Sequence, residues 1–236
     1  MEVGFFCSPQ SFLAADIAID LISSIIVFAI AIYAFRLYKT KKQYGSCKSL
    51  ALFGTALLAL GTSFLIRTIT YFNVIISENG GVYRQLFVNT GDMQSILFIC
   101  GFISYRVLTV LGFFIIYCIA FKKDSWLSKA LVFLLLISNT VLLRYNVSQT
   151  FYLTTMLLLA IIALRYRQQY LVTKNPNTKC VAISFMLLSL SYLLIMVSEW
   201  LATMYIFSKL IWLGSFILLL WSFIRTLKDG KKKNKA

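Results

Sequence analysis

Six charged residues lie within stretches of the sequence that are otherwise apolar, and they are the residues best placed to bind a polar ligand or to carry a proton. They are Asp16, Asp20, Arg67, Arg106, Glu199 and Lys209. A charged side chain inside a bilayer is costly unless it has a partner, so each of the six is a candidate ligand-binding residue. Three acids stand against three bases, which favours a ligand that carries both signs of charge.

The spacing and depth of these residues predict a common location. Asp16 and Asp20 are four residues apart and therefore share one face of a helix. Arg106 lies near the middle of its apolar stretch, and the other five lie in the outer half of the membrane. The inner halves of the stretches are almost wholly apolar, as at residues 27–32 and 110–116. We expect a polar cavity that opens outward and is closed below by apolar side chains.

Arg106 is the expected partner of the two carboxylates. Arginine presents a fixed fork of donors that can satisfy a carboxylate at two points, which suits a buried site. We therefore expect Arg106 to face the interior of the protein and to pair with Asp20 or Asp16, directly or through water.

The sequence argues against an enzyme, a metal centre and a cofactor. It contains no histidine, which removes His-ligated zinc hydrolysis and His-based acid–base catalysis. The five cysteines do not have the spacing of metal ligands, and there is no glycine-rich phosphate loop and no nucleophile elbow. The two aspartates lie on one helix, whereas an intramembrane aspartyl protease needs acids that face each other from two helices. We expect a non-enzymatic protein.

The elements that must position these residues are seven apolar stretches. A helix needs about 20 apolar residues to cross the hydrocarbon core, and 60% of this chain is hydrophobic. The stretches run roughly over residues 12–38, 49–71, 95–120, 129–143, 151–167, 180–201 and 205–224. We expect an all-α membrane protein, a bundle of seven transmembrane helices over residues 1–227, followed by a basic disordered tail over residues 228–236.

The distribution of basic residues predicts the orientation. Eighteen of the 23 Lys and Arg residues fall at every second gap between the apolar stretches, within residues 36–48, 122–129, 165–179 and 225–235. Basic residues near the ends of membrane helices collect on the cytoplasmic side, so the N-terminus is expected outside and the C-terminus inside a cell membrane. The net charge of +15 then reflects this topology and attraction to anionic lipid of the bilayer, not binding of nucleic acid.

Two finer features of the architecture are also expected. Residues 73–94 form the longest outer loop, and Asn79-Gly80-Gly81 between two β-rich pieces predicts a hairpin that lies across the outer face. The pair of segments 34–36 and 57–60 is echoed by residues 163–165 and 187–190 at almost the same separation. Two explanations stay open: leucine-rich helices resemble each other by composition alone, or the chain has a three-plus-one-plus-three arrangement in which spans 1 and 2 are equivalent to spans 5 and 6.

Part of the sequence resembles prokaryotic seven-span sensor modules, including small stand-alone archaeal membrane proteins. The resemblance lies in YAFRLYK at residues 33–39, LALF at 50–53, LLALG at 57–61 and FLIR at 64–67. It implies an outward N-terminus and a sensing role. Such modules often precede histidine kinases or other output domains, whereas we expect no output domain after Ile224 here. We therefore expect a stand-alone sensor or scaffold whose basic inner loops dock a separate cytoplasmic protein.

Two functions of different classes follow from these residues. The first is a receptor-like sensor or scaffold that binds a small amphiphilic ligand or lipid in the outer cavity. The alternative is a small proton- or solute-coupled transporter, in which Asp20 and Arg106 are the coupling pair. A transporter must hydrate the inner half of the bundle during turnover, whereas a receptor keeps it dry.

Overall fold

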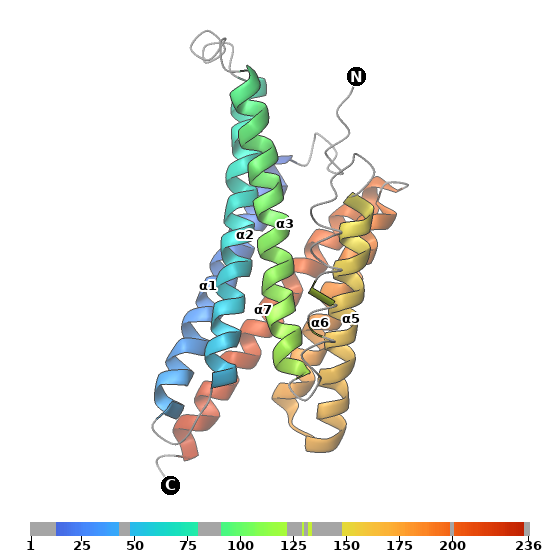
Figure 1. Cartoon of the computed structure of the whole chain (residues 1–236). Helices are drawn as coiled ribbons and strands as arrows, with labels where there is room; N and C mark the ends of the chain where they lie inside the picture. The colour runs from blue at the N-terminus through green and yellow to red at the C-terminus, as the bar shows by residue number, and fades with distance from the viewer. Residues whose placement is uncertain are drawn as a thin grey trace.

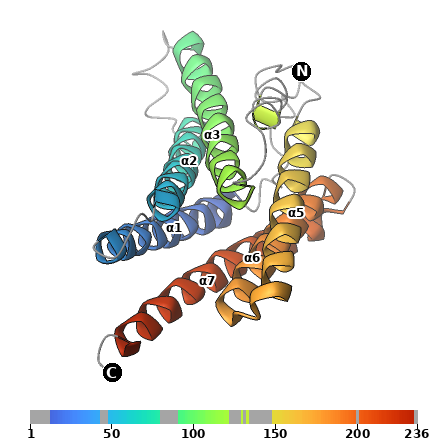
Figure 2. The ribbon, with the colours of Figure 1, turned by 60° about the horizontal axis from the view of Figure 1, so that its bottom comes forward.

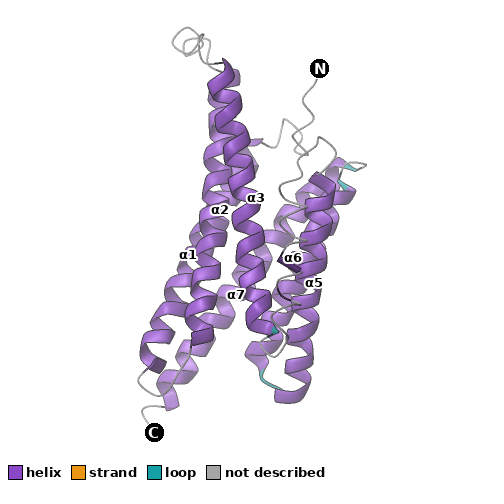
Figure 3. Cartoon of the chain, in the orientation of Figure 1, coloured by secondary structure: helices purple, strands orange, loops and turns teal. Residues whose placement is uncertain are grey.

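The computed structural model describes residues 13–42, 48–79, 91–121, 148–198 and 201–233, together with Lys129, Val132 and Phe133. The long elements are six helices: α1 (Leu13–Lys42), α2 (Lys48–Asn79), α3 (Gly91–Ala120), α5 (Ser148–Thr173), α6 (Pro176–Val197) and α7 (Ala202–Lys233) (Figure 1). The described part of the chain contains helices and short connections and no strand, as Figure 3 shows. The all-α class expected from the sequence is confirmed.

Each of the six helices contains a span of 21 to 25 residues that is long and apolar enough to cross a membrane. Their surfaces agree with a lipid environment, because large apolar side chains such as Ile25 and Trp221 stand more than 60% exposed on the outside. The expected fourth span, residues 129–143, lies mostly outside the described residues. Its described part is helical, and the Phe133 ring lies 4.9 Å from that of Phe114 on α3.

The six helices form two units of three. Helix α2 packs between α1 and α3 in one unit, and α6 packs between α5 and α7 in the other. The units meet along two seams, where α7 contacts α1 and where α3 contacts α5 (Figures 1 and 2). Each seam thus joins the last helix of one unit to the first helix of the other, which is the packing expected of a three-plus-one-plus-three arrangement.

The turn between α5 and α6 shows how the sequence ends one helix and starts the next. Lys174 takes a left-handed conformation with φ of 53°, which reverses the chain within two residues. The Asn175 side chain then accepts a hydrogen bond from the Asn177 backbone N–H, and Pro176 occupies the first turn of α6. Asparagine at the cap and proline at the first helical position are favoured for this role.

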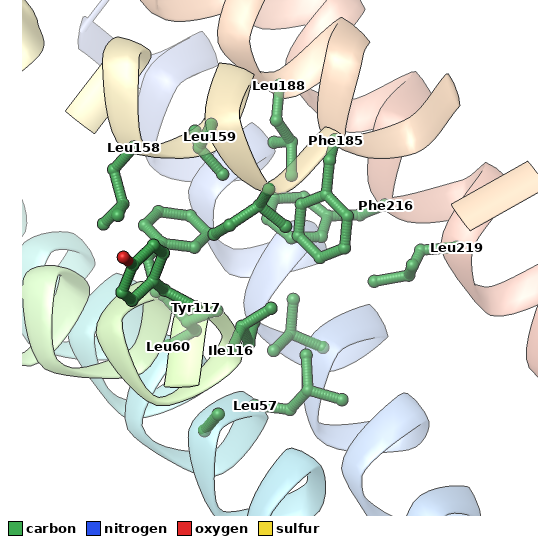
Figure 4. Close-up of a cluster of buried hydrophobic side chains, with 14 of the residues drawn as sticks. Leu57, Leu60, Ile116, Tyr117, Leu158, Leu159, Phe185, Leu188, Phe216 and Leu219 are labelled. Atoms are coloured by element: carbon green, nitrogen blue, oxygen red, sulfur yellow. The ribbon is translucent and has the colours of Figure 1, made fainter. Parts of the chain in front are cut away.

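The apolar core lies toward the end of the bundle where α1 and α7 finish. Its side chains come from both units, and Figure 4 labels Leu57, Leu60, Ile116, Tyr117, Leu158, Leu159, Phe185, Leu188, Phe216 and Leu219. The predicted apolar segments contribute Val27, Ile30, Val110 and Phe113, all at most 3% exposed. The expectation of an apolar half below the charged residues is confirmed for the described helices.

Helices α2 and α3 approach each other closely at Gly112. A β-carbon there would lie 2.6 Å from the Leu60 Cγ and 3.0 Å from the Ala56 carbonyl oxygen. The missing side chain therefore allows α3 to lie directly on the α2 backbone. Gly214 on α7 has no such neighbour, since nothing lies within 4 Å of the position of its β-carbon.

Two boundaries differ from those expected. Helix α2 continues to Asn79 and α3 already begins at Gly91, so the hairpin expected over residues 73–94 is wrong at residues 73–79 and 91–94; residues 80–90, which include the expected turn at Gly80-Gly81, lie outside the described residues. Helix α7 continues to Lys233, beyond residue 228 where the tail was expected to begin. Both differences have one physical reason: adding a residue to an existing helix forms a hydrogen bond at little cost, which overrides weak local preferences for strand or coil.

Candidate functional site

Helices α1 and α7 run parallel and in a fixed register at the site. The Tyr205 hydroxyl donates to Asp16 and the Lys209 ammonium donates to Asp20, and the two partners are 189 residues apart in both cases. The two pairs lie one helical turn apart, because Asp16 and Asp20 are four residues apart on α1 and Tyr205 and Lys209 are four residues apart on α7. The carboxylate face of α1 is therefore applied to one face of α7, and the two aspartates predicted to share a face do so.

Four charged side chains from three helices meet here, and we call Asp16, Asp20, Arg67 and Lys209 the charge cluster. Lys209 Nζ lies 3.2 Å from Asp20 Oδ1 and 3.4 Å from Asp16 Oδ1. Arg67 Nε lies 3.2 Å from Asp20 Oδ2. The four residues are only 1–7% exposed, so the cluster is buried and its two negative and two positive charges balance.

One oxygen of the charge cluster keeps acceptor capacity. The contact between Arg67 Nε and Asp20 Oδ2 is short enough for an ion pair but is not aligned as a hydrogen bond, and within the described chain this oxygen accepts none. The other oxygen of Asp20 accepts from Lys209 at 3.2 Å. A buried carboxylate with a spare acceptor site is chemically able to receive a further donor.

Three tyrosines complete the surroundings of the charge cluster. Besides the Tyr205 hydroxyl on Asp16, Arg67 donates to the hydroxyls of Tyr71 and Tyr105, at 3.3 Å each. The guanidinium also lies 5.2 and 5.1 Å from the centroids of the Tyr71 and Tyr105 rings. The rings thus offer both hydroxyl groups and electron-rich faces, and the latter attract cations.

The charge cluster occupies one level of the bundle, near the end where α1 and α7 begin. Asp20 and Lys209 each lie seven residues after the first residue of their helix, which is Leu13 for α1 and Ala202 for α7. At about 1.5 Å per residue, both therefore lie about 10 Å along the helix from its first residue. The contact of Arg67 with Asp20 puts Arg67 at the same level on α2.

Arg106 is buried as predicted, at 2% exposed, but it lies elsewhere. Its guanidinium is 4.1 Å from the centroid of the Phe102 ring and 5.2 Å from that of Phe151 on α5, which places it in the seam between α3 and α5. The direct ion pair expected with Asp20 or Asp16 is wrong, since the ion pairs of those carboxylates within the described chain are made with α2 and α7. The reason is geometric: of two neighbouring residues on α3, Tyr105 contacts Arg67 at the charge cluster, whereas Arg106 is turned toward Phe151 on α5.

One predicted site residue has no described position, and three tyrosines at the site were not predicted from the sequence. Glu199 lies outside the described residues. The tyrosines were missed, although two of them had a signal in the sequence: Tyr71 follows Arg67 by four residues and Tyr205 precedes Lys209 by four. That spacing puts each tyrosine on the same helical face as its cation.

Short polar side chains tie the helices together just beneath the charge cluster. Ser24 donates to the Gly61 carbonyl at 2.9 Å and so joins α1 to α2. Thr109 on α3 donates to Ser63 on α2 at 3.1 Å. These bonds fix the helices that carry the aspartates and Arg67 relative to each other.

The arrangement is suited to exchange of charges. The described residues contain no group of three or more His, Cys, Asp or Glu side chains close enough to hold a metal ion. They do place two carboxylates, an ammonium and a guanidinium in mutual contact. The cation of a ligand can therefore pair with a carboxylate in place of Lys209 or Arg67, and the anion of a ligand can pair with Lys209 or Arg67 in place of a carboxylate.

Comparisons with protein-family models, with curated proteins and with solved structures found no match for this chain.

Proposed function

We propose that this protein is a non-enzymatic, receptor-like seven-helix membrane protein that binds a small zwitterionic amphiphile or lipid at the charge cluster. The observation that carries the proposal is the meeting of two acids and two bases, buried at one level from α1, α2 and α7. Such a site offers a partner to each charge of a zwitterion, and it offers little to a simple ion, which would leave one sign of charge unmatched.

A purely structural role explains the charge cluster less well. Buried ion pairs add little to stability, because desolvation of the charges offsets their attraction, and well-packed apolar residues often stabilise a protein as much or more. Lysine, arginine and two aspartates in a membrane interior are therefore best explained by interaction with charges from outside the chain. The three tyrosines around them supply ring faces and hydroxyl groups that suit a quaternary ammonium or amine.

The proposed orientation places the charge cluster in the outer half of the membrane. It rests on the basic residues at the opposite end of the bundle, which include Arg167 and Lys179 among the described residues. With this orientation a ligand reaches the charge cluster from the outer leaflet or from outside the cell. A separate cytoplasmic protein docking on the basic inner loops then receives the signal, as the resemblance to sensor modules implies.

A second candidate function, transport, is favoured by the packing of the two three-helix units. Parallel repeats with a site at their interface are a known design of secondary transporters, and the charge cluster spans the seam between α1 and α7. A cysteine introduced at Phe113, now 0% exposed, distinguishes the two functions. In a receptor it stays unreactive toward a cytoplasmic thiol reagent, whereas in a transporter it reacts during turnover.

Equilibrium binding of a tritium-labelled alkylphosphocholine, with protein in nonionic maltoside micelles, tests the proposed function. The wild-type protein is expected to bind it saturably, and Asp20→Asn is expected to weaken binding at least about tenfold, because a buried charge contact is lost. The matched control is Arg167→Gln, which removes an exposed charge at the other end of the bundle and should leave binding unchanged. Absence of saturable binding, or equal binding by Asp20→Asn, would overturn the proposal.

A further inference from the structure

Three buried hydrogen-bond donors lie next to the charge cluster without a hydrogen-bond partner in the described part of the chain. They are the hydroxyls of Ser23 on α1 and Ser208 on α7 and the indole Nε1 of Trp212 on α7. The three residues are 0%, 0% and 2% exposed. A buried donor without a partner costs about 1–3 kcal/mol, so such groups are rare in folded proteins and call for an explanation.

The three donors lie at nearly the same level, on the two helices that carry Asp20 and Lys209. On α7, Trp212 lies three residues after Lys209 and four after Ser208, so its side chain leaves the helix between those of the other two residues. The register of 189 residues that joins Asp20 to Lys209 also brings Ser23 level with Trp212. All three therefore lie within about one turn of the Asp20–Lys209 ion pair, mostly on its side toward the apolar core.

Other buried serines in these helices do make hydrogen bonds. Ser24 donates to the Gly61 carbonyl, and Ser215, which is 0% exposed on α7, donates to the Trp212 carbonyl at 2.6 Å. Burial alone thus does not leave a serine without a partner in this protein.

The indole of Trp212 is held in place by its neighbours. Its ring centroid lies 5.3 Å from that of Phe64, 5.1 Å from that of Tyr192 and 5.7 Å from that of Phe216. Rings from α2, α6 and α7 therefore surround it, and it cannot turn to seek an acceptor without disturbing the core. The indole N–H can therefore form a hydrogen bond only with an acceptor that reaches it in its present position.

We infer that Ser23, Ser208 and Trp212 form a donor subsite for the anionic oxygen atoms of the ligand, with the ammonium of Lys209 beside them; this inference rests on the proposed function. An indole N–H can only donate, and both hydroxyls are able to donate, so the subsite selects an acceptor such as a phosphate or carboxylate oxygen. The positive charge of Lys209 strengthens each of these bonds to an anion.

The order of the chemical groups along the seam then specifies the class of ligand. From the middle of the bundle toward the end where α1 begins come the apolar core, then Trp212 and Ser23, then Ser208 beside Lys209, and last Asp16 with Tyr205. A ligand that matches this order carries an apolar tail, then an anion, then a terminal cation. Phosphocholine and phosphoethanolamine amphiphiles have this order, whereas carboxybetaine amphiphiles have the reverse order of tail, cation and anion.

Competition between two zwitterions of opposite order tests the inference. The probes are a tritium-labelled alkylphosphocholine and an alkyl carboxybetaine of the same chain length, both added to the full chain in maltoside micelles. We expect the phosphocholine to bind at least about tenfold more tightly, since only it presents its anion to the donor subsite. Ser208→Ala and Trp212→Phe are each expected to weaken phosphocholine binding at least about tenfold, as loss of one bond to a charged group implies, and to leave carboxybetaine binding unchanged.

A matched variant and a second readout separate this role from a structural one. Ser215→Ala removes an equally buried hydroxyl that bonds within its own helix, and phosphocholine binding should not change. Without ligand, Ser208→Ala should unfold no more easily than the wild type, because its hydroxyl has no partner within the described chain. The inference is overturned if both zwitterions bind equally while Asp20→Asn still weakens them, or if Ser208→Ala binds like the wild type. If neither zwitterion binds at all, the proposed function fails and the subsite with it.

Discussion

Replacing Lys209 by methionine removes the cation that holds both carboxylates of the charge cluster. Methionine keeps most of the length and volume of the lysine side chain, so the change tests the charge and not the packing. It leaves Asp16 and Asp20 close together with Arg67 as the remaining cation of the cluster. A buried site that was neutral then carries a net charge of about −1.

The distances in the charge cluster set the size of the expected effect. Lys209 Nζ is 3.2 Å from one carboxylate and 3.4 Å from the other. At an effective dielectric constant of about 20, each contact contributes about 5 kcal/mol of attraction, most of which the desolvation of the charges offsets. Removing one partner of a buried ion pair leaves the desolvation cost of the other partner without compensation. We therefore expect Lys209→Met to lower the free energy of unfolding by about 3–5 kcal/mol.

A second substitution separates the charge effect from other damage. Asp16→Asn in the Lys209→Met background restores neutrality, because Asp20 keeps Arg67 at 3.2 Å and an asparagine at position 16 is still able to accept from the Tyr205 hydroxyl. We expect the double variant to recover about 2 kcal/mol, within the usual range of coupling energies between residues in contact.

Unfolding in mixed maltoside and dodecyl sulfate micelles, followed by far-ultraviolet circular dichroism, measures all four members of this cycle. Arg167→Met is the control for loss of a positive charge at an exposed site, and its unfolding should match that of the wild type. A decrease of less than about 1 kcal/mol in the free energy of unfolding of Lys209→Met would refute the role of Lys209 as the shared cation, and so would a double variant no more stable than Lys209→Met alone.

Three further outcomes are expected. Gly112→Ala should lower the free energy of unfolding by about 1–3 kcal/mol in the same assay, because the new methyl group overlaps α2. Gly214→Ala should raise the free energy of unfolding by about 0.5–1 kcal/mol, because alanine makes the unfolded chain less flexible than glycine does. Equal effects of the two substitutions would contradict the close packing of α2 and α3. Phe151→Leu should lose about 1–2 kcal/mol, because a buried guanidinium 5.2 Å from the ring centroid loses its aromatic face, and a neutral result would show that this contact adds nothing. A reporter active only in the cytoplasm should give signal when fused after Ala236 and none when inserted at Gly80, and the reverse pattern would invert the proposed orientation.

The sequence by itself determined the all-α class of the described part of the chain, the ability of its helices to cross a membrane, and which charges lie inside them. These are local properties, since they depend on the length of an apolar stretch and on the charges within it. That Asp16 and Asp20 share one face of a helix is also a local property, because helical periodicity fixes it. The extension of α2 and α7 was not predicted, because β-rich or charged composition competes only weakly with continuation of a helix that has already formed.

Only the tertiary structure decided which cation neutralises which carboxylate. The depth of Arg106 and its fork of donors predict that it pairs with Asp20, yet α3 turns it toward α5, while Arg67 and Lys209 reach Asp20 from α2 and α7. Which helices are neighbours, and how each is rotated about its axis, depends on side-chain packing between segments far apart in the chain. The donor subsite at the charge cluster was likewise decided only by the tertiary structure. A hydroxyl or an indole N–H is known to lack a hydrogen-bond partner only once every helix packed around it is in place.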